Sequence, residues 1–222
     1  QAVYFKGSPL RPRPALRHAL RRWTGQAEIP RLQEFVNLEW LRARDFLAAR
    51  PLCAGVQTRA GLPRYQFLVT EFVPDAPDLA ALFPRAAPER RAALLAALAR
   101  DVARLHGLGF VHRDLFPRNL LAVADPAGER CLFLDAWRGG ARRGLRGPEH
   151  DLGCLFLDGA SLFSPSEQAL FLTTYRAESL RQGRNLPRAW AEGVERARRV
   201  VWRREARRRP EVAPAWKFPS LS

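Results

Sequence analysis

The chain has 222 residues, of which 47% are hydrophobic, so it can bury a core and is not an intrinsically disordered segment. Its 37 basic residues against 22 acidic ones give a net charge of +15, which favours an anionic partner: nucleic acid, anionic lipid or a phosphorylated sugar. No apolar run approaches the roughly 18 residues of a membrane-spanning helix, and the first residues do not resemble a signal peptide. Because the sequence contains no Met, we expect it to be a fragment that lacks upstream residues.

Two residue types are used sparingly. The three cysteines, Cys53, Cys131 and Cys154, are far apart, odd in number and without metal-ligand spacing, so we expect buried free thiols and a reducing cytoplasm. The only lysines are Lys6 and Lys217, since arginine supplies the other positive charges. A lysine in this chain therefore calls for a specific explanation.

The first part of the chain predicts a strand, an irregular segment and a helix. Residues 2–6 are strand-like, and the Pro- and Arg-rich residues 8–30 indicate an irregular connection. From Leu32 the apolar residues recur at helical spacing, and Pro51 should end that helix. The expected apolar stripe consists of Leu32, Phe35, Val36, Ala43, Phe46 and Leu47.

A small sheet should follow, and then a domain boundary. Two strand-like runs, 54–59 and 64–70, are joined by the turn AGLP, and residues 71–78 have the composition of a linker. The sequence therefore predicts a sheet-rich domain over 1–70 and a larger helical domain over 79–222.

The second domain should begin with a long helix and continue into a hairpin. The helix covers 88–108, with Leu94, Leu95, Leu98, Val102 and Leu105 as its apolar face. The loop segment FVHRDLFPRNLLAV then leads into a short strand, which the turn DPAG at 125–128 folds back onto CLFLD. Helical patterns resume at Asp151, and the tail from Arg181 to Arg209 contains eleven arginines.

The loop and hairpin carry the residues suited to phosphoryl transfer. This reaction needs a carboxylate that orients the attacking hydroxyl and accepts its proton, and oxygen ligands that hold Mg²⁺ against the ATP phosphates. Asp114, Asn119 five residues later and Asp135 at the far end of the hairpin would supply these groups. The segment H-R-D-L-F-P-R-N over 112–119 resembles the catalytic loop of the protein-kinase-like superfamily. The alternative is a surface loop that reads His-Arg-Asp by chance.

The resemblance implies further site residues. The superfamily has a strand lysine that contacts the α and β phosphates and pairs with a helix glutamate, and Lys6 ends the first strand. Glu39 lies within the apolar stripe of the next helix, where a carboxylate needs a partner, so we predict a Lys6–Glu39 pair. Glu34 falls off the stripe and should be solvated. Glu71, the first residue of the linker, is a further candidate for cofactor binding.

Other residues should support the catalytic loop. In the superfamily an aspartate at the position of Asp151 holds the loop backbone, and an ordinary charge at a helix N-terminus is the alternative. His112 and Arg113 are expected to support the loop rather than to catalyse. No partner is visible in the sequence for His18 or His106, which should be structural or exposed.

Three features separate the chain from eukaryotic-type protein kinases. Phe116 stands where Ser/Thr kinases usually have Lys, Asp135 is followed by Ala-Trp-Arg, and only fifteen residues separate Asp135 from Asp151. With GFVHRDLFPRNLL, LFLDAWRGG and DLGCLFLDGASLF, the chain resembles the bacterial lipopolysaccharide kinase family (WaaP-like), which phosphorylates Kdo or heptose of the inner core. The resemblance runs from Lys6 to about Tyr175.

The resemblance implies an α+β, two-lobed protein-kinase-like fold with a truncated first lobe, since the expected glycine-rich loop does not precede Lys6. It implies ATP and Mg²⁺ as cofactors, an anionic glycolipid or sugar as acceptor, and a cytoplasmic enzyme that contacts the inner membrane peripherally. The alternatives are a small-molecule phosphotransferase of the aminoglycoside or choline type, an atypical protein kinase, a pseudokinase and a nucleic-acid-binding protein. Nucleic acid is not the expected partner, because only Trp190 and Trp202 interleave the arginines of the tail.

Overall fold

The computed structural model describes residues 2–10, 29–125, 128–140, 147–157 and 162–208. The chain divides into two compact units, one made of Gln1–Asp75 and Phe133–Gly139 and the other of Ala76–Leu132 and Gly140–Ser222. The first division falls within the linker predicted at 71–78. The return of Phe133–Gly139 to the first unit was not predicted from the sequence.

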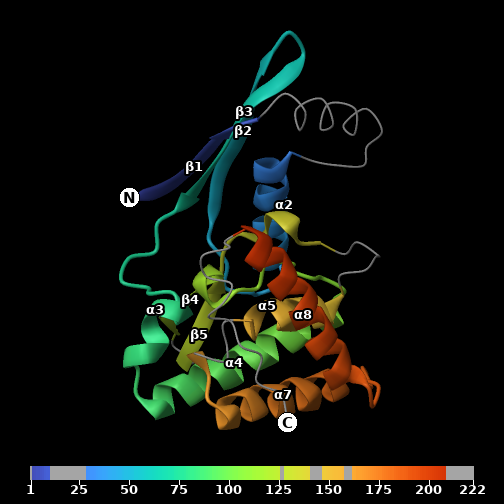
Figure 1. Ribbon diagram of the computed structural model, residues 1–222. Coiled ribbons are helices and arrows are strands. Elements are labelled where there is room, and N and C mark those ends of the chain that lie inside the picture. Colours follow the sequence, from blue (N-terminus) through green and yellow to red (C-terminus); the bar gives the residue numbers. More distant parts are fainter. Residues whose placement is uncertain (1, 11–28, 126–127, 141–146, 158–161, 209–222) are drawn as a thin grey trace. The chain divides into compact units, whose positions relative to one another are not determined.

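The first unit contains a three-stranded antiparallel sheet in the order β1-β3-β2 (Figure 1). Strand β1 is Val3–Pro9, β2 is Pro51–Arg59 and β3 is Leu62–Glu71. The three predicted strands are confirmed, although β1 extends into the segment expected to be irregular. The rest of that segment, residues 11–28, lies outside the described residues. Cys53 lies on the edge strand β2 and is exposed, so its predicted burial was wrong, whereas Cys131 and Cys154 are buried.

Helix α2 (Pro30–Arg42) packs against β2 and β3. It begins with Pro at its first turn, where the missing N–H costs no hydrogen bond. The helix ends well before Pro51, because Asp45 adopts a left-handed backbone with φ of 58°. The predicted apolar stripe was also wrong, since Val36 is 48% exposed. The buried face instead consists of Glu34, Asn37, Leu38 and Leu41.

The second unit begins with α3 (Leu79–Leu82) and the 3-10 turn η1 (Phe83–Arg85), followed by α4 (Pro88–Gly107). Helix α4 confirms the predicted helix, and all five residues of its predicted apolar face are fully buried. The hairpin of β4 (Leu120–Asp125) and β5 (Gly128–Phe133) is confirmed as well. The two residues at its turn, 126–127, lie outside the described part of the chain.

Three further helices lie in the described part of the second unit: α5 (Pro148–Leu155), α7 (Pro165–Arg181) and α8 (Trp190–Arg208). Helix α7 packs along α4, and α5 packs against α8 (Figure 1). Helix α8 contains most of the arginine-rich tail, and Val194 and Val201 lie on its buried face. Within the described residues, no helix is both long enough and apolar enough to cross a membrane.

The contact between α5 and α8 depends on Gly153. A Cβ atom at this position would lie 2.8 Å from the backbone nitrogen of Arg198 and 3.0 Å from the backbone carbon of Ala197. Backbone atoms cannot rotate away as a side chain does, so α8 would have to shift. We expect Gly153→Ala to lower the free energy of unfolding by roughly 1–3 kcal/mol, the usual cost of overpacking, as measured by denaturant titration.

Gly193→Ala in α8 is the matched control. Its added Cβ would first meet the Cγ atom of Glu149 at 3.3 Å, and that side chain can move. Helix propensity favours Ala over Gly by about 0.8–1 kcal/mol, so this variant should be as stable as the parent or more stable. Equal stability of the Gly153→Ala and Gly193→Ala proteins would show that the α5–α8 packing does not require glycine.

Candidate active site

In the second unit, the catalytic loop lies between α4 and β4. Asp114 is followed by Phe116 and by the 3-10 turn η2 (Pro117–Asn119). The Nδ2 atom of Asn119 donates a hydrogen bond of 2.8 Å to the backbone carbonyl of Asp114. This bond closes the loop on itself, and it uses the amide nitrogen while leaving the amide oxygen as a ligand atom. The Asp114 side chain is 19% exposed, so a substrate hydroxyl can reach it.

Asp151, in the first turn of α5, holds the backbone of this loop. Its Oδ2 atom accepts a hydrogen bond of 2.6 Å from the backbone N–H of His112, and its Oδ1 atom accepts one of 2.6 Å from that of Arg113. Arg113 has a left-handed backbone with φ of 65°, a conformation that costs a non-glycine residue free energy. The fully buried carboxylate offsets this cost by binding both N–H groups. This is the contact that the superfamily resemblance implied for Asp151.

Two further buried side chains fix the Asp151 carboxylate. The Nε2 atom of His106 lies 3.1 Å from Asp151 Oδ2, and its Nδ1 atom lies 2.8 Å from the hydroxyl of Tyr175. Since Nε2 faces a carboxylate, it carries the proton, and Nδ1 accepts from the Tyr175 hydroxyl. Burial raises the pKa of Asp151, but the hydrogen bonds from His106 and the His112 backbone outweigh burial and hold that pKa below its usual range.

The hydrogen bonds among His106, Asp151 and Tyr175 join α4, α5 and α7. Burial raises the pKa of Tyr175, which therefore stays a neutral donor. His106 is structural, one of the two roles expected for it, while Tyr175 was not predicted at all. The three residues are 45 and 24 positions apart along the chain, so no local spacing indicates that they meet.

Phe116 anchors the loop from the other side. The ring is fully buried against Cys154 and Leu157 and, on α8, against Val201. The guanidinium of Arg118 lies 3.9 Å from the centroid of the ring. The residue that replaces the usual lysine of Ser/Thr protein kinases is therefore an apolar anchor, and it makes α8 part of the support of the loop.

In the first unit, Lys6 meets two carboxylates. Its Nζ atom lies 2.9 Å from Glu34 Oε1 and 2.6 Å from Asp135 Oδ1. The Nη1 atom of Arg31 lies 2.6 Å from the second oxygen of Glu34. Burial lowers the pKa of Lys6, but Glu34 and Asp135 outweigh this effect and the pKa is raised, so the ammonium stays charged.

The predicted Lys6–Glu39 pair was therefore wrong. Glu34 is 1% exposed and binds Lys6, whereas Glu39 is exposed. Two residues that are five positions apart in an α-helix differ by about 140° in direction around its axis, so Glu34 and Glu39 face different sides. The prediction assumed that apolar residues mark the buried face of the helix, but α2 buries polar side chains for use in the site.

Asn37 is a second buried polar side chain on this face, and no sequence pattern predicted it. Its Nδ2 atom donates to the backbone carbonyls of Ala136, at 2.6 Å, and Gly139, at 3.1 Å. These carbonyls belong to the 3-10 turn η3 (Ala136–Arg138) and the residue after it. Asp135 precedes η3 with a left-handed backbone, and Asn37 thus fixes the turn that presents its carboxylate.

Two predicted roles stay predictions. Glu71 ends β3, where its backbone N–H donates to the carbonyl of Arg50, and no described contact tests a role in cofactor binding. Among the described residues, no group of three or more His, Cys, Asp or Glu side chains is arranged to hold a metal ion. The predicted role of Asn119 and Asp135 as Mg²⁺ ligands therefore stays a prediction.

The two glutamates of α2 offer a paired test. Glu34→Gln should lower the rate of ATP-dependent transfer by about 10–100-fold, because a charged hydrogen bond contributes about 1.5–3 kcal/mol and the half-buried Lys6 loses a charged partner. Glu39→Gln changes the same helix at an exposed position and should keep parental kcat and KM for ATP. Similar kinetics of the two variants would remove Glu34 from the site.

A model of the lipopolysaccharide kinase (Kdo/WaaP) family matches residues 15–175 of the chain. The chain belongs to this family. It is therefore a kinase, a phosphotransferase that uses ATP and acts on a sugar of the lipopolysaccharide core, as the sequence predicted. The matched residues include the catalytic loop, Asp135 and Asp151, whereas Lys6 and α8 lie outside the matched range.

Comparison with solved structures gives the fold. The chain is similar to a structure of WaaP in complex with acyl carrier protein, with a TM-score of 0.60 and 22% identity over 77% of this chain and 75% of that one. This likeness confirms the predicted α+β, protein-kinase-like fold. Acyl carrier protein is a partner of that protein and is not among the partners predicted here from the sequence. A search of curated proteins finds no match.

Proposed function

We propose that the kinase transfers the γ-phosphoryl group of ATP to a hydroxyl of Kdo or heptose in the lipopolysaccharide inner core, with Asp114 as the catalytic base. The attacking oxygen forms a bond to the γ-phosphorus, its proton passes to the Asp114 carboxylate, and the bond to the β-phosphate oxygen breaks, which releases ADP. The observation that carries this proposal is the catalytic loop itself, held by Asp151 at two backbone N–H groups.

Asp114 has the properties that a base in this position needs. Its side chain is partly exposed, and the hydrogen bond from Asn119 goes to its backbone carbonyl rather than to its carboxylate. The carboxylate is therefore available to a substrate hydroxyl, while the backbone beneath it is fixed. Proton transfer by a positioned group of this kind contributes about 10²–10⁴-fold to a rate.

Lys6 would bind the phosphates of the nucleotide. An ammonium group has three donors, and Glu34 and Asp135 receive two of them, so a phosphate oxygen can receive the third. Arg31 and Glu34 then orient Lys6. A charged lysine, as its raised pKa indicates, suits an anionic ligand.

Asn119 and Asp135 are the proposed ligands of Mg²⁺. The donors fit a hard cation: a carboxylate from Asp135 and the amide oxygen of Asn119, whose nitrogen is already bonded to the loop. When bound, the ion would neutralise charge on the phosphate oxygens. The side chains of Asn37 and Asp151 would keep the backbone of the two ligand segments in place.

We also propose that the enzyme lies peripherally at the cytoplasmic face of the inner membrane. The net charge of +15 supports it, and so do exposed arginines such as Arg196 and Arg199 on α8, which are 69% and 62% exposed. Each basic residue near an anionic leaflet contributes about 1 kcal/mol to binding. A glycolipid acceptor would be met at such a surface.

The experiment that tests the function is ATP turnover by the full-length protein against a panel of acceptors. Core sugars and lipid A–core should be phosphorylated, while aminoglycosides and a generic protein should not. Preferred phosphorylation of an aminoglycoside would favour the small-molecule alternative, and preferred phosphorylation of the protein would favour an atypical protein kinase. Absence of turnover with every acceptor would favour a pseudokinase.

A further inference from the structure

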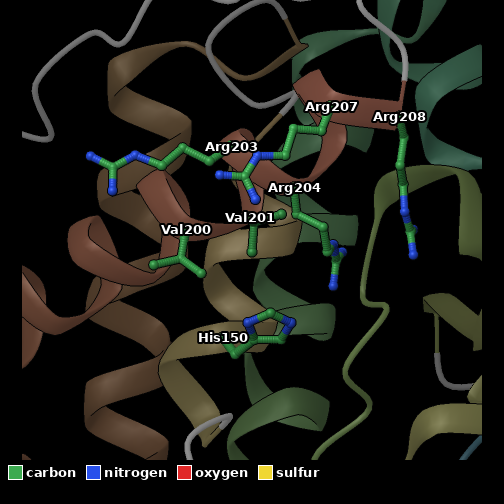
Figure 2. Close-up of a pocket in the computed structure, with 7 residues that line it drawn as sticks. All are labelled: His150, Val200, Val201, Arg203, Arg204, Arg207 and Arg208. Atoms are coloured by element: carbon green, nitrogen blue, oxygen red, sulfur yellow. The ribbon is translucent and has the colours of Figure 1, made fainter.

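A basic pocket lies against the C-terminal half of α8, within the second unit. Its volume is about 450 Å³. Figure 2 shows the side chains of Arg204 and Arg208 extending in the same direction from α8, with the imidazole of His150 below Val201. The lining consists of His150 from α5 and of Val200, Val201, Arg203, Arg204, Arg207 and Arg208 from α8.

The positive charge of this pocket is only partly balanced. Glu205 pairs with two of the four arginines: its Oε1 atom lies 2.9 Å from Arg204 Nε and 3.3 Å from Arg208 Nη1. In the described part of the chain, neither Arg203 nor Arg207 has an acidic partner within 4.0 Å. With the Asp114 carboxylate near Arg204, two carboxylates lie within 4.0 Å of four guanidinium groups, so the pocket keeps a positive charge that attracts an anion.

Arg204 connects the pocket to the catalytic base. Its Nη2 atom lies 3.9 Å from Asp114 Oδ1, beyond hydrogen-bonding distance. Both Nη atoms are buried, and neither meets an oxygen or nitrogen acceptor at hydrogen-bonding distance among the described residues. The Cys154 thiol is a neighbour of the same guanidinium. Buried guanidinium donors without an oxygen acceptor cost free energy, which an anion in the pocket would recover.

We propose that this α8 pocket binds an anionic group of the acceptor, a carboxylate or a phosphate carried by the sugar substrate, and thereby places the acceptor hydroxyl beside Asp114. The proposal rests on the proposed function and adds to it the site that recognises the acceptor. Arginine suits this role, because its planar donors match the two oxygens of a carboxylate or phosphate. The pocket arginines lie beyond residue 175, so the family match does not assign them.

The position of Arg204 explains why acceptor recognition would serve catalysis. Because one guanidinium lies beside both the pocket and Asp114, an anion that it binds is held next to the base. A neutral sugar would lack this anchor and bind in more orientations. We therefore assign the pocket to the acceptor rather than to ATP.

The test compares two double variants of α8 in the full-length enzyme. Arg207→Gln with Arg208→Gln removes two charges from the pocket, and Arg196→Gln with Arg199→Gln removes two from exposed positions on the same helix. Arg204 is left unchanged because it neighbours Asp114. With a soluble core oligosaccharide as acceptor, the pocket variant should show a KM for the acceptor raised by about 10-fold or more. Its KM for ATP should be parental, and the control should match the parent for both substrates.

Two forms of the acceptor identify the anionic group. One oligosaccharide carries carboxylates and no phosphate, and the other is the same molecule with its carboxyl groups reduced to alcohols and a phosphate added. Whichever form loses affinity in the pocket variant, but not in the control variant, supplies the group that is bound. Equal KM values for parent and pocket variant with both forms would overturn the proposal.

Calorimetric binding of the same oligosaccharides in the absence of ATP separates this proposal from the proposed function. Binding that depends on Arg207 and Arg208 without any sugar phosphorylation would support the pocket and contradict the kinase reaction. Phosphorylation of the sugar with equal acceptor affinity in both double variants would support the kinase reaction and contradict the pocket proposal. Binding of both double variants to anionic vesicles is measured as well. If both lose vesicle binding equally and keep their affinity for the acceptor, the arginines bind a membrane surface and the pocket proposal fails.

Discussion

Asp114→Asn is expected to lower kcat by about 10²–10⁴-fold while the protein stays folded. Asparagine has the shape of aspartate but cannot take up the proton of the acceptor hydroxyl. The fold should tolerate the change, because Asn119 bonds to the backbone carbonyl of residue 114 and not to the side chain. The measurement is the initial rate of phosphoryl transfer to a core sugar under saturating ATP and acceptor.

A surface aspartate provides the control for Asp114→Asn. Asp45 is exposed and has a left-handed backbone, which asparagine adopts as readily as aspartate. Asp45→Asn should therefore keep parental kcat and stability. If Asp114→Asn retained activity within a few-fold of the Asp45→Asn enzyme, Asp114 would not be the catalytic base.

The spacing of apolar residues was sufficient to predict an element and its buried face wherever that face is apolar throughout. Helix α4 carries five leucine and valine residues at regular spacing, and all of them are buried as the period predicts. The hairpin of β4 and β5 is equally local, since β4 ends at Asp125 and β5 begins three positions later, at Gly128. The catalytic loop, which lies between α4 and β4, was predicted from its motif, because phosphoryl transfer dictates the residue types and their spacing.

The spacing of apolar residues did not predict the buried face of an element where the fold buries polar side chains for function. Helix α2 turns Glu34 and Asn37 inward because Lys6 and the carbonyls of Ala136 and Gly139 supply their hydrogen bonds. Those partners lie 28 to 102 positions away, and one sequence contains no signal that pairs them. The same holds for the contact of Tyr175 with His106 and for the packing of Val201 on Phe116.

Asp151→Asn should be among the most damaging substitutions to the fold of the second unit. The amide can accept only through one oxygen, so one of the two backbone N–H groups at His112 and Arg113 would face an NH₂ group instead. The proton of His106 Nε2 would lose its charged acceptor as well. Removal of one member of a buried charged network costs about 3–5 kcal/mol, which we expect as the loss in free energy of unfolding at pH 7. The loop should then lose its geometry, and kcat should fall with it.

The effect of pH separates this role from a general loss of packing. The pKa of Asp151 is lower in the folded protein than in the unfolded chain, where the pKa of aspartate is about 3.9. Its ionised form therefore stabilises the fold above that pH, and this contribution is lost as the pH falls through the folded pKa. The difference in unfolding free energy between the parent and Asp151→Asn, measured by denaturant titration, should be largest near pH 7 and shrink towards pH 3.

Asp101 on α4 provides a comparison of opposite sign. Burial raises its pKa despite the nearby Arg130 and Arg104, so the folded state binds its proton more tightly than the unfolded chain does. The parent therefore gains stability from Asp101 as the pH falls, and the difference between the parent and Asp101→Asn should shift in the parent's favour towards acid. Parallel pH trends for the Asp101 and Asp151 variants would mean that the Asp151 carboxylate does not hold the loop by its charge.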